Sequence, residues 1–464
     1  MLRIFKQYYP IRNALFVFGE GIFIFSSVLI ASRIILKLEN SSLQDQGVFW
    51  KALLITIICQ ICLFYNDLYD LKITDTLVEL GIRLLQALGA SAILLGLIYF
   101  VFPDCIIKEG IFIVSITLSI ILIVSWRIGY TKVLSLGLFN QKIMILGSSE
   151  IAKEICTQII KKKDCGYEIA NIITKGSWNG QDLNYPIHLI YQETYENICD
   201  IADQSGVRKI IVALQEKRGT LPVKELLKCR VRGIEVLEGN SFYEMLTGKL
   251  IVESINPGWL IFSQGFQKSH FQRLIKRTVD LILSLSMLII LMPIIAILSI
   301  IIKLDSKGPV LFSQERIGEN RRPYMIHKFR SMKTDAEKNT GPVWAQYNDD
   351  RITRIGHFIR KWRFDEIPQL WNVLKGEMSF VGPRPEREYF ISELETMIPY
   401  YGERFSVKPG LTGWAQVSYG YGASVEDAIE KLNYDLFYIK NMSILMDMMI
   451  VARTVKTVIF GHGR

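Results

Sequence analysis

The sequence reads Arg360-Lys-Trp-Arg-Phe-Asp-Glu-Ile-Pro-Gln-Leu-Trp-Asn-Val-Leu-Lys-Gly376 and, shortly afterwards, Gly382-Pro-Arg-Pro385. Two adjacent carboxylates, Asp365 and Glu366, lie here between clustered cations. The apolar residues that follow recur at helical spacing as far as Gly376, a residue type that commonly ends a helix. We therefore predict a helix that begins with Asp365 as its N-cap and ends at Gly376.

A helix that begins at Asp365 would place both carboxylates where the helix dipole and free N–H groups favour anions. A carboxylate in that position stays ionised and lies beside a ready site for phosphate. An isolated Asp at a helix start is usually no more than a cap. The other residues of the chain decide between these two interpretations.

The composition favours a membrane protein with about three domains. Of the 464 residues, 50% are hydrophobic, and the mean hydropathy of +0.24 is positive. The formal net charge of +9 suits an anionic lipid surface or phosphorylated substrates. Nucleic acid is the alternative partner, but we expect none, because no basic stripe with interleaved aromatic residues stands out.

The seven cysteines do not indicate a metal or redox site. Cys59 and Cys62 have C-x-x-C spacing, but they lie in an apolar segment without a second pair or nearby histidines. We expect them to pack in the hydrophobic interior. The N-terminus has no small-residue cleavage site, so no removable signal peptide is expected.

The N-terminal part of the chain predicts a transmembrane four-helix bundle over residues 1–135. It contains four apolar segments, at residues 15–36, 51–65, 82–102 and 111–133. Cations precede the first segment and follow the fourth, whereas the turn near Asp104 has no cationic excess. The positive-inside rule therefore places both ends of the bundle in the cytoplasm. For Glu20, within the first segment, an interior polar contact is one interpretation, and snorkelling or helix pairing is the favoured one.

Residues 141–250 show the alternation of strands and helices that is typical of a small doubly wound α/β domain. Buried strands are predicted at 142–147, 209–214 and 233–237, and a helix at 150–162. The turn Gly147-Ser-Ser-Glu-Ile-Ala152 places Ser and Ala at the later glycine positions of the dinucleotide fingerprint. A side chain there crowds a pyrophosphate, so we expect a vestigial or regulatory nucleotide fold and no working NAD site.

The apolar run 278–304 is long enough to cross a bilayer, but cations flank it on both sides. Pro293 lies in the middle of the run, where it removes a backbone hydrogen bond and bends a helix. Two interpretations are open: a proline-kinked transmembrane helix, or a re-entrant helix that enters and leaves by the cytoplasmic face. Length and charge alone do not separate them.

Further cations follow this run and accompany the carboxylate pair. The segment 324–332 alternates apolar and polar residues like a strand, so Lys328 and Arg330 should share one face. Pro383 and Pro385 rigidify the backbone on both sides of Arg384. So many cations beside two carboxylates suit a diphosphate bound through Mg²⁺, although a solvated charged face is the common alternative.

Three motifs now make a resemblance specific: Lys328-Phe-Arg-Ser-Met332, the run from Asp365 to Pro385, and Lys408-Pro-Gly-Leu-Thr-Gly-Trp-Ala-Gln-Val417. They resemble those of the bacterial polyprenyl-phosphate glycosyl-1-phosphate transferases, the initiating enzymes of exopolysaccharide and capsule assembly. The matching motifs run from about residue 268 to the C-terminus. The preceding domains are more weakly similar to the large subclass of this family. Tyr419-Gly-Tyr-Gly-Ala-Ser-Val-Glu-Asp-Ala428 resembles its branch linked to exopolysaccharide export and exosortase systems.

The resemblance implies a membrane protein of three parts. These are a four-helix transmembrane bundle, a degenerate Rossmann-like α/β domain without catalytic function, and a mainly helical catalytic domain over residues 265–464. A re-entrant helix at 278–304 would anchor the catalytic domain in one leaflet. The family often has Ser-Pro at the break of this helix, whereas Met292 precedes Pro293 here. The apolar tail 443–460 is interrupted by charges and should be an interfacial amphipathic helix.

The resemblance also implies a reaction and its partners. Sugar-1-phosphate would pass from a nucleoside-diphosphate sugar, usually a UDP-sugar, to undecaprenyl phosphate with release of UMP. Asp365 would be the nucleophile that forms a phosphosugar–aspartyl intermediate. Glu366, with Asp365, would hold Mg²⁺ or manage the proton of the acceptor. The residues expected to bind the phosphates and the nucleotide are Lys328, Arg330, Arg360, Arg384, Lys408 and Gln416.

The family pattern also marks Asp435, which would anchor an active-site arginine. The expected location is the bacterial inner membrane, with the catalytic domain on the cytoplasmic face. The identity of the sugar and the formation of a homodimer are left open.

Two other functions are compatible with parts of the sequence. A membrane-anchored nucleotide-sugar dehydratase or epimerase shares the layout and uses a Tyr-x-x-x-Lys pair. Tyr324 and Lys328 have that spacing, but they lie in a strand-like stretch far from the turn at Gly147. A non-catalytic scaffold for polysaccharide export would not need the intact acid pair. The sequence therefore favours an enzyme.

Overall fold

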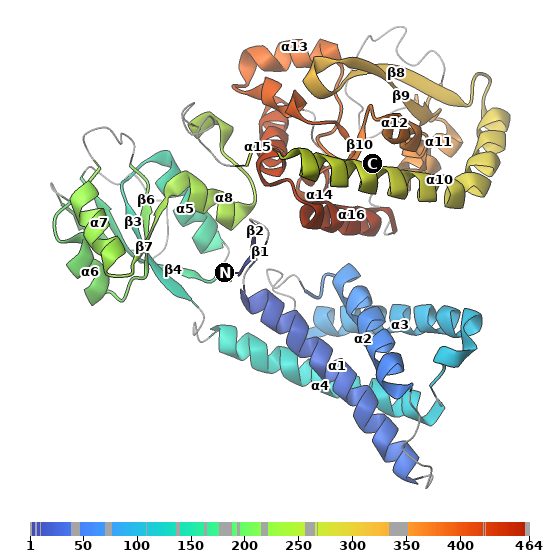
Figure 1. The fold of residues 1–464 in the computed structure, drawn as a ribbon, viewed down its shortest axis with the longest axis horizontal. Helices are drawn as coiled ribbons and strands as arrows, with labels where there is room; N and C mark the ends of the chain where they lie inside the picture. The colour runs from blue at the N-terminus through green and yellow to red at the C-terminus, as the bar shows by residue number, and fades with distance from the viewer. Residues whose placement is uncertain are drawn as a thin grey trace. The chain divides into compact units, whose positions relative to one another are not determined.

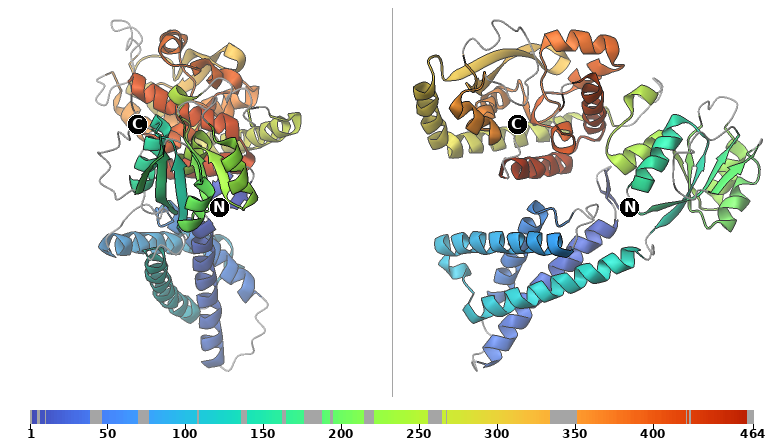
Figure 2. Two further views of the ribbon diagram at one scale, coloured as in Figure 1. Left: turned by 90° about the vertical axis from the view of Figure 1, so that its left-hand side faces the viewer. Right: turned by 180° about the vertical axis from the view of Figure 1, so that it is seen from behind.

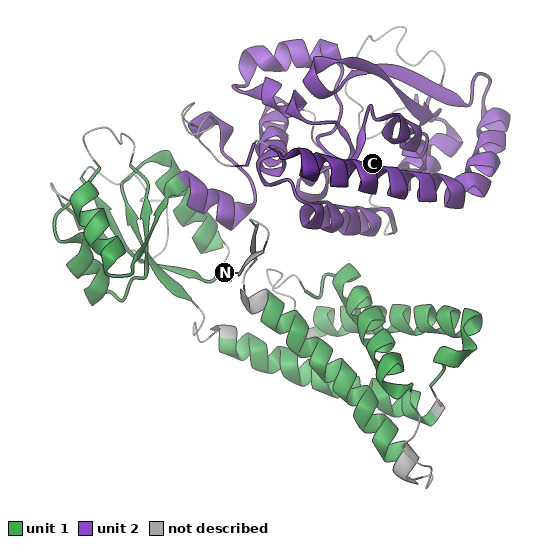
Figure 3. Ribbon diagram, in the orientation of Figure 1, with its two compact units in different colours: residues 1–239 green, residues 240–464 purple. Residues whose placement is uncertain are grey.

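The chain forms two compact units, residues 1–239 and 240–464, which are described in turn (Figure 3). Residues 240–250, which the sequence placed with the α/β domain, are part of the second unit. The computed structural model describes residues 2–4, 7–9, 11–38, 47–69, 77–107, 109–135, 140–161, 165–175, 188–192, 195–214, 221–255, 265–266, 268–333, 351–420, 422 and 424–459.

The first unit begins with apolar helices (Figure 1). Its first elements are β1 (Leu2–Ile4), β2 (Gln7–Tyr9), α1 (Ile11–Leu38), α2 (Val48–Tyr65), α3 (Leu77–Val101), the 3-10 helix η1 (Pro103–Cys105) and α4 (Glu109–Ser135). α1 packs against α4 and α2, and α2 packs against α3. The four helices are long and apolar enough to cross a membrane, as is α10 (His270–Asp305) of the second unit. The prediction of a membrane protein with four N-terminal apolar helices is confirmed.

A buried ion pair fastens α1 to α4. Arg127 Nε lies 2.8 Å from Glu20 Oε1, and its Nη1 donates a 2.8 Å hydrogen bond to the carbonyl oxygen of Leu68. An unpaired charge in an apolar interior is costly, so each side chain needs the other. Glu20 thus forms an interior polar contact, and this contact pairs α1 with α4.

The rest of the first unit is a five-stranded parallel sheet in the order β5-β4-β3-β6-β7. Its elements are β3 (Gln141–Leu146), α5 (Glu150–Lys161), β4 (Tyr167–Thr174), β5 (His188–Tyr191), α6 (Ile198–Gln204), β6 (Lys209–Val212), α7 (Val223–Val231) and β7 (Glu235–Glu238). The central strand β3 pairs in parallel with both β4 and β6. This is the strand order of a doubly wound nucleotide fold, so the predicted α/β architecture is confirmed.

The turn after β3 is closed against the end of β6. Gly147 has a φ of +107°, and a Cβ atom there would lie 2.3 Å from the carbonyl oxygen of Ala213. Ser149 Oγ donates a 2.7 Å hydrogen bond to the same oxygen. A side chain at position 147 would clash with the backbone of Ala213, so the turn between β3 and α5 requires glycine there.

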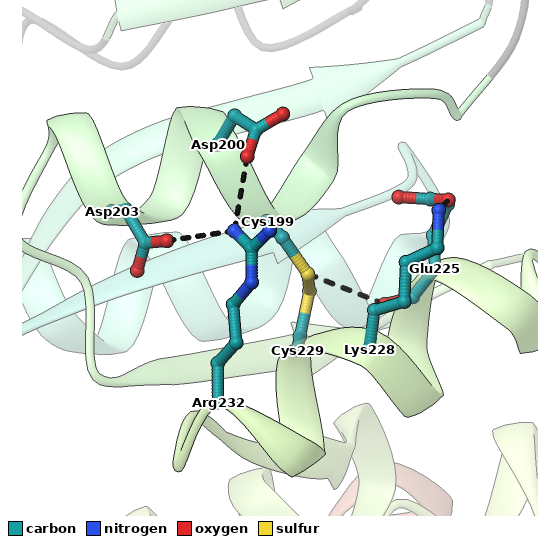
Figure 4. Close-up of a disulfide and its surroundings, with 7 residues drawn as sticks. All are labelled: Cys199, Asp200, Asp203, Glu225, Lys228, Cys229 and Arg232. Carbon is teal, nitrogen blue, oxygen red and sulfur yellow. Dashed lines mark hydrogen bonds and ion pairs between the residues drawn. A yellow bond between two sulfur atoms is a disulfide. The ribbon is translucent and has the colours of Figure 1, made fainter.

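A disulfide between Cys199 and Cys229 joins α6 to α7, with the two Cα atoms 5.2 Å apart (Figure 4). Beside it, Arg232 forms ion pairs of 3.0 Å with Asp200 and with Asp203. No sequence pattern indicates this pairing, because the cysteines are 30 residues apart and belong to no spacing motif. Both contacts hold α6 against the segment that contains α7.

The second unit is mainly helical, with two small two-stranded sheets. β8 pairs with β9 in antiparallel fashion, and β10 pairs with β11 in parallel. Besides α10, the elements are α8 (Gly239–Thr247), η2 (Val252–Ser254), β8 (Leu311–Ile317), η3 (Glu319–Arg321), β9 (Pro323–Phe329), α11 (Arg354–Lys361), η4 (Phe364–Glu366), α12 (Gln369–Lys375), β10 (Ser379–Val381), α13 (Glu388–Met397), η5 (Tyr401–Ser406), β11 (Gly410–Thr412), α14 (Trp414–Ser418), α15 (Val425–Asn441) and α16 (Ile444–Ile459).

α10 is bent into two arms, as Figures 1 and 2 show. Pro293 lies inside this helix and cannot donate a backbone hydrogen bond, which accounts for a bend in an apolar segment. Asp280 of α10 is buried and accepts hydrogen bonds from Ser379 Oγ at 2.8 Å and from the backbone N of Phe380 at 3.0 Å. The bent helix is therefore fastened to β10, the strand that precedes Gly382.

Candidate active site

The carboxylate pair lies in a tight turn. Asp365 and Glu366 belong to the 3-10 helix η4, which follows Arg363 in the left-handed conformation, with a φ of 54°. The helix α12 begins only at Gln369 and ends at Gly376, whose φ is 87°. The prediction of Asp365 as the N-cap is wrong, because Arg363 turns the chain and a 3-10 turn intervenes before the helix. The predicted end at Gly376 is confirmed.

Glu366 is surrounded by cations. Its Oε1 accepts hydrogen bonds from Lys328 Nζ at 3.1 Å and from Arg384 Nη2 at 2.9 Å. Arg363 Nη1 lies 3.5 Å from Oε2. Asp365 is equally buried, at 9% exposure against 7% for Glu366. No described residue forms an ion pair with Asp365, so the two adjacent carboxylates have different surroundings.

These surroundings separate the pKa values of the two carboxyl groups. Burial raises the pKa of Asp365 to about 6, the charge of Glu366 adds to the increase, and Lys328, Arg360 and Arg384 offset part of it. Burial also acts to raise the pKa of Glu366, but its three cations outweigh that effect and hold this pKa well below its usual value. Glu366 therefore stays ionised, whereas Asp365 titrates just below neutrality.

Close backbone packing positions Arg384. The backbone N of Gly382 donates a 2.9 Å hydrogen bond to Thr412, and the backbone N of Gly410 donates one of 2.9 Å to Pro383. A Cβ atom on Gly382 would lie 2.4 Å from the carbonyl oxygen of Lys408, so only glycine fits there. The segment that contains Pro383, Arg384 and Pro385 is thus held against β11.

A buried ion pair supports the same segment from behind. Arg404 Nη2 lies 2.9 Å from Asp435 Oδ2 and also donates a 3.1 Å hydrogen bond to the carbonyl oxygen of Arg384. Asp435 and Arg404 are 2% and 7% exposed. Asp435, expected to anchor an active-site arginine, binds Arg404 and through it the backbone of Arg384.

The structure places Arg330 away from the carboxylate pair. Its Nη2 donates hydrogen bonds to the carbonyl oxygens of Ile302 at 3.1 Å and Ser306 at 2.6 Å, at the C-terminal end of α10. Lys328 binds Glu366, whereas Arg330 Nη2 binds the end of α10, and the phosphate-binding role of Arg330 stays a prediction.

The other predicted binding residues have different positions. Arg360, on α11, is close enough to lower the pKa of Asp365 in part. Lys408 lies at the opposite end of α12, where its Nζ would be 3.5 Å from a Cβ atom on Gly376. Gln416 Oε1 is buried and has no hydrogen-bond partner in the described part of the chain. The structure therefore gathers Lys328, Arg360 and Arg384 around the pair and leaves Lys408 outside it.

Two features of the site were not indicated by sequence patterns. Arg363, one of the clustered cations, contacts Glu366, but periodicity gives no sign of its left-handed conformation. Gln369 is 3% exposed and its Nε2 has no hydrogen-bond partner among the described residues. A polar residue so close to the carboxylates, at the start of an apolar helix, was the available signal.

The carboxylate oxygens of Asp365 and Glu366 are of the chemical type that binds Mg²⁺. Among the described residues, no group of three or more His, Cys, Asp or Glu side chains could hold a metal ion. Mg²⁺ usually takes one or two carboxylates, with water and substrate phosphates completing the shell. Among the described residues, Asp365 has no ion-pair partner, and the ion pair of Glu366 Oε2 is the 3.5 Å contact with Arg363. Both oxygens are hard donors of the kind that Mg²⁺ prefers.

The Tyr-x-x-x-Lys spacing is formed by Tyr324 and Lys328. Both lie in β9 of the second unit, whereas the turn at Gly147 belongs to the first. Lys328 instead binds Glu366. The tyrosine and the lysine therefore belong with the carboxylate site.

Comparisons with known proteins agree with this location of the site. The family model for bacterial sugar transferases matches residues 271–461. The chain is 39% identical over 238 residues to the UDP-N-acetylgalactosamine-undecaprenyl-phosphate N-acetylgalactosaminephosphotransferase of Aeromonas hydrophila, covering 51% of this chain and 55% of that protein. It is 40% identical over 337 residues to the UDP-glucose:undecaprenyl-phosphate glucose-1-phosphate transferase of Klebsiella pneumoniae, covering 71% and 68%.

A third relative, the undecaprenyl-phosphate glucose phosphotransferase of Komagataeibacter xylinus, is 33% identical over 330 residues, which cover 70% of this chain and 60% of that protein. The chain therefore spans 55% and 60% of the length of the Aeromonas and Komagataeibacter proteins and 68% of the Klebsiella protein. All three relatives are named as enzymes that transfer a sugar phosphate to undecaprenyl phosphate.

Proposed function

Because the chain belongs to the bacterial sugar transferases that act as polyprenyl-phosphate glycosyl-1-phosphate transferases, we propose that it transfers sugar-1-phosphate from a UDP-sugar to undecaprenyl phosphate. The products are undecaprenyl-diphosphate-sugar and UMP. The reaction is the first membrane step of exopolysaccharide or capsule synthesis. The names of the relatives support both substrates.

The difference between the two carboxylates supports a covalent route more than any other observation. Glu366 is held by three cations, whereas Asp365 is buried beside it without an ion-pair partner among the described residues. An ionised, poorly solvated carboxylate next to cations is suited to attack a phosphorus atom. Asp365 is therefore the nucleophile.

The proposed reaction exchanges phosphorus–oxygen bonds in two steps. An oxygen of Asp365 bonds to the sugar-bearing phosphorus, and the bond from this phosphorus to the bridging oxygen breaks. That oxygen leaves with the electron pair as part of UMP. In the second step an oxygen of the lipid phosphate attacks the same phosphorus, and the bond to Asp365 breaks. One phosphoanhydride replaces another, so little net driving force is needed.

The cations lower the barrier by neutralising phosphate charge. Lys328 and Arg384 converge on Glu366 Oε1, and Arg360 acts on Asp365 through space. Such preorganised charges act where negative charge accumulates in the transition state. Mg²⁺, held by Glu366 and Asp365 together with substrate oxygens, would supply further neutralisation of the diphosphate. We assign Glu366 to metal binding. Its alternative role is that of a base that removes a proton from the acceptor.

Because the proposed acceptor is a lipid, the active site must lie at the membrane, and the bent apolar helix α10 could hold it there. We propose that α10 is re-entrant and holds the second unit on the cytoplasmic face of the bacterial inner membrane. Cations at both ends of the apolar run and the bend within α10 support this arrangement. The amphipathic helix α16 would lie in the interface. The carboxylate pair would then meet a phosphate head group at the membrane surface.

The test is a screen of UMP release by the purified full chain with a panel of UDP-sugars, undecaprenyl phosphate and Mg²⁺. The relatives are named for glucose and N-acetylgalactosamine, so these donors come first. We expect UMP release to require Mg²⁺, and we expect sustained turnover to require undecaprenyl phosphate as the acceptor as well. No release with any donor would favour a non-catalytic scaffold, and persistence in excess chelator would remove the metal from the account.

A further inference from the structure

The hairpin of β8 and β9 carries two groups that the reaction above does not use. The antiparallel register places Arg316 directly opposite Tyr324. Side chains of directly opposed residues lie on the same face, with their Cβ atoms about 5 Å apart. Lys328 is four residues from Tyr324 on the same strand and therefore shares this face too. One face of the hairpin thus presents Lys328 to Glu366 at one end, and Arg316 with Tyr324 at the other.

The Arg316 end of the hairpin is tied to the segment that contains Arg384. The backbone N of Ile317 donates a 3.1 Å hydrogen bond to the carbonyl oxygen of Glu386, two residues after Arg384. Arg384 in turn contacts Glu366 at 2.9 Å. Arg384 is also among the charges that act on both Arg316 and Tyr324. Arg384 is therefore close both to the carboxylate site and to the Arg316–Tyr324 pair.

Tyr324 has a polar group without a use in the protein itself. Its side chain is 9% exposed, and its hydroxyl is buried with no hydrogen-bond partner in the described part of the chain. A buried hydroxyl without a partner costs on the order of a lost hydrogen bond, and such groups are rare in folded proteins. A ligand oxygen would remove that cost.

The charge around Tyr324 specifies the sign of the ligand. Arg316 has the amide oxygen of Gln314, at 2.9 Å, as its hydrogen-bond acceptor among the described residues. Burial lowers the pKa of Arg316, Glu386 opposes this effect, and the nearby Arg384 and Arg387 add to it. The guanidinium groups outnumber the carboxylates here, so the ligand that fits is an anion.

We propose that Arg316 and Tyr324, together with Arg384, form a subsite for the phosphate of the nucleotide that leaves the donor. This assignment rests on the proposed function, because it takes a UDP-sugar as the donor. Asp365 attacks the sugar-bearing phosphorus, so the second phosphate of the donor must lie beyond it. Arg384 contacts Glu366 and is also close enough to act on Arg316 and Tyr324, so these two groups lie within reach of a second phosphate beside the carboxylate site. The UMP released carries extra negative charge on its phosphate. The side chains of Arg316, Tyr324 and Arg384 would bind that phosphate.

The experiment measures UMP binding by calorimetry and steady-state kinetics on the full chain in detergent with Mg²⁺. Tyr324→Phe and Arg316→Gln should each weaken UMP binding about tenfold, as expected for one hydrogen bond to a charged group. The KM for the UDP-sugar should rise in proportion, with the KM for undecaprenyl phosphate unchanged. Tyr324→Phe removes a group that has no partner, so its thermal unfolding should match that of the parent protein.

Two exposed residues of the same unit provide matched controls. Arg322→Gln removes a cation from the same hairpin and Tyr389→Phe removes a tyrosine hydroxyl from α13, and neither should change UMP binding. Unchanged UMP affinity in a folded Tyr324→Phe protein would overturn the subsite, as would a rise confined to the KM for undecaprenyl phosphate. If the parent protein neither binds UMP nor uses any UDP-sugar, the proposed function itself fails.

Discussion

Lys328 Nζ lies 3.1 Å from Glu366 Oε1 and joins β9 to the turn η4 across 38 residues of sequence. This contact fixes the charge of Glu366 and leaves Asp365 beside it without an ion-pair partner among the described residues. The two neighbouring carboxylates are thereby given different tasks.

Lys328→Gln should lower kcat by about 10²–10³-fold, the usual cost of removing one preorganised charge from a transition-state site. Lys361→Gln removes an exposed cation from the adjacent helix α11 and should leave kcat within about twofold. UMP release at saturating donor and acceptor measures both. A Lys328→Gln protein with parental kcat would show that the ion pair with Glu366 has only a structural role.

The rate should depend on pH through Asp365, whose pKa is raised to about 6 by burial. A nucleophile must be deprotonated, so kcat/KM should fall about tenfold per pH unit below that value and level off above it. Arg360 lowers this pKa in part. Arg360→Gln should therefore shift the acid limb to higher pH, measured on the residual activity. A limb that stays in place or moves to lower pH would contradict this assignment.

The buried pair of Arg404 and Asp435 should be needed for stability. Asp435→Ala leaves the Arg404 guanidinium buried without its partner, which typically costs about 3–5 kcal/mol. Activity should fall as well, because Arg404 also holds the backbone of Arg384. Glu395→Ala breaks the exposed pair with Arg321 and should cost about 1 kcal/mol or less. Equal unfolding temperatures for the two variants would refute the prediction.

The topology of α10 can be tested at its two ends. Arg273→Cys and Lys307→Cys, each in a background without the native cysteines, place a thiol at an exposed position near either end of the helix. If α10 is re-entrant, an impermeant thiol reagent should label neither in intact spheroplasts and both after the inner membrane is opened. Labelling of one end in intact spheroplasts would instead identify a membrane-spanning helix.

Local patterns predicted the elements of the fold better than the contacts between them. Apolar runs located the four N-terminal helices and the strand β3, because length and hydrophobicity are properties of a continuous segment. The bend of α10 was predicted from Pro293, because a proline acts on the helix that contains it and is visible in the local sequence. The disulfide of Cys199 depends on two helices meeting, and no local pattern encodes that.

The site shows the same division. The cations and carboxylates were visible in the sequence, and Lys328 and Arg384 do meet Glu366. The left-handed conformation of Arg363 was not foreseen, and it replaced the expected cap by a 3-10 turn. Arg330 Nη2 binds carbonyl oxygens at the end of α10, a contact between separate segments that no local pattern encodes.

The most direct test of the central claim is the isolation of the covalent intermediate. The full chain is incubated with its UDP-sugar and Mg²⁺ without acceptor, then digested and examined by mass spectrometry. The peptide that contains Asp365 should gain the mass of one sugar phosphate, lose it when undecaprenyl phosphate is added, and remain unmodified in Asp365→Asn. Turnover by Asp365→Asn, or sugar phosphate bound to a different residue, would contradict the account.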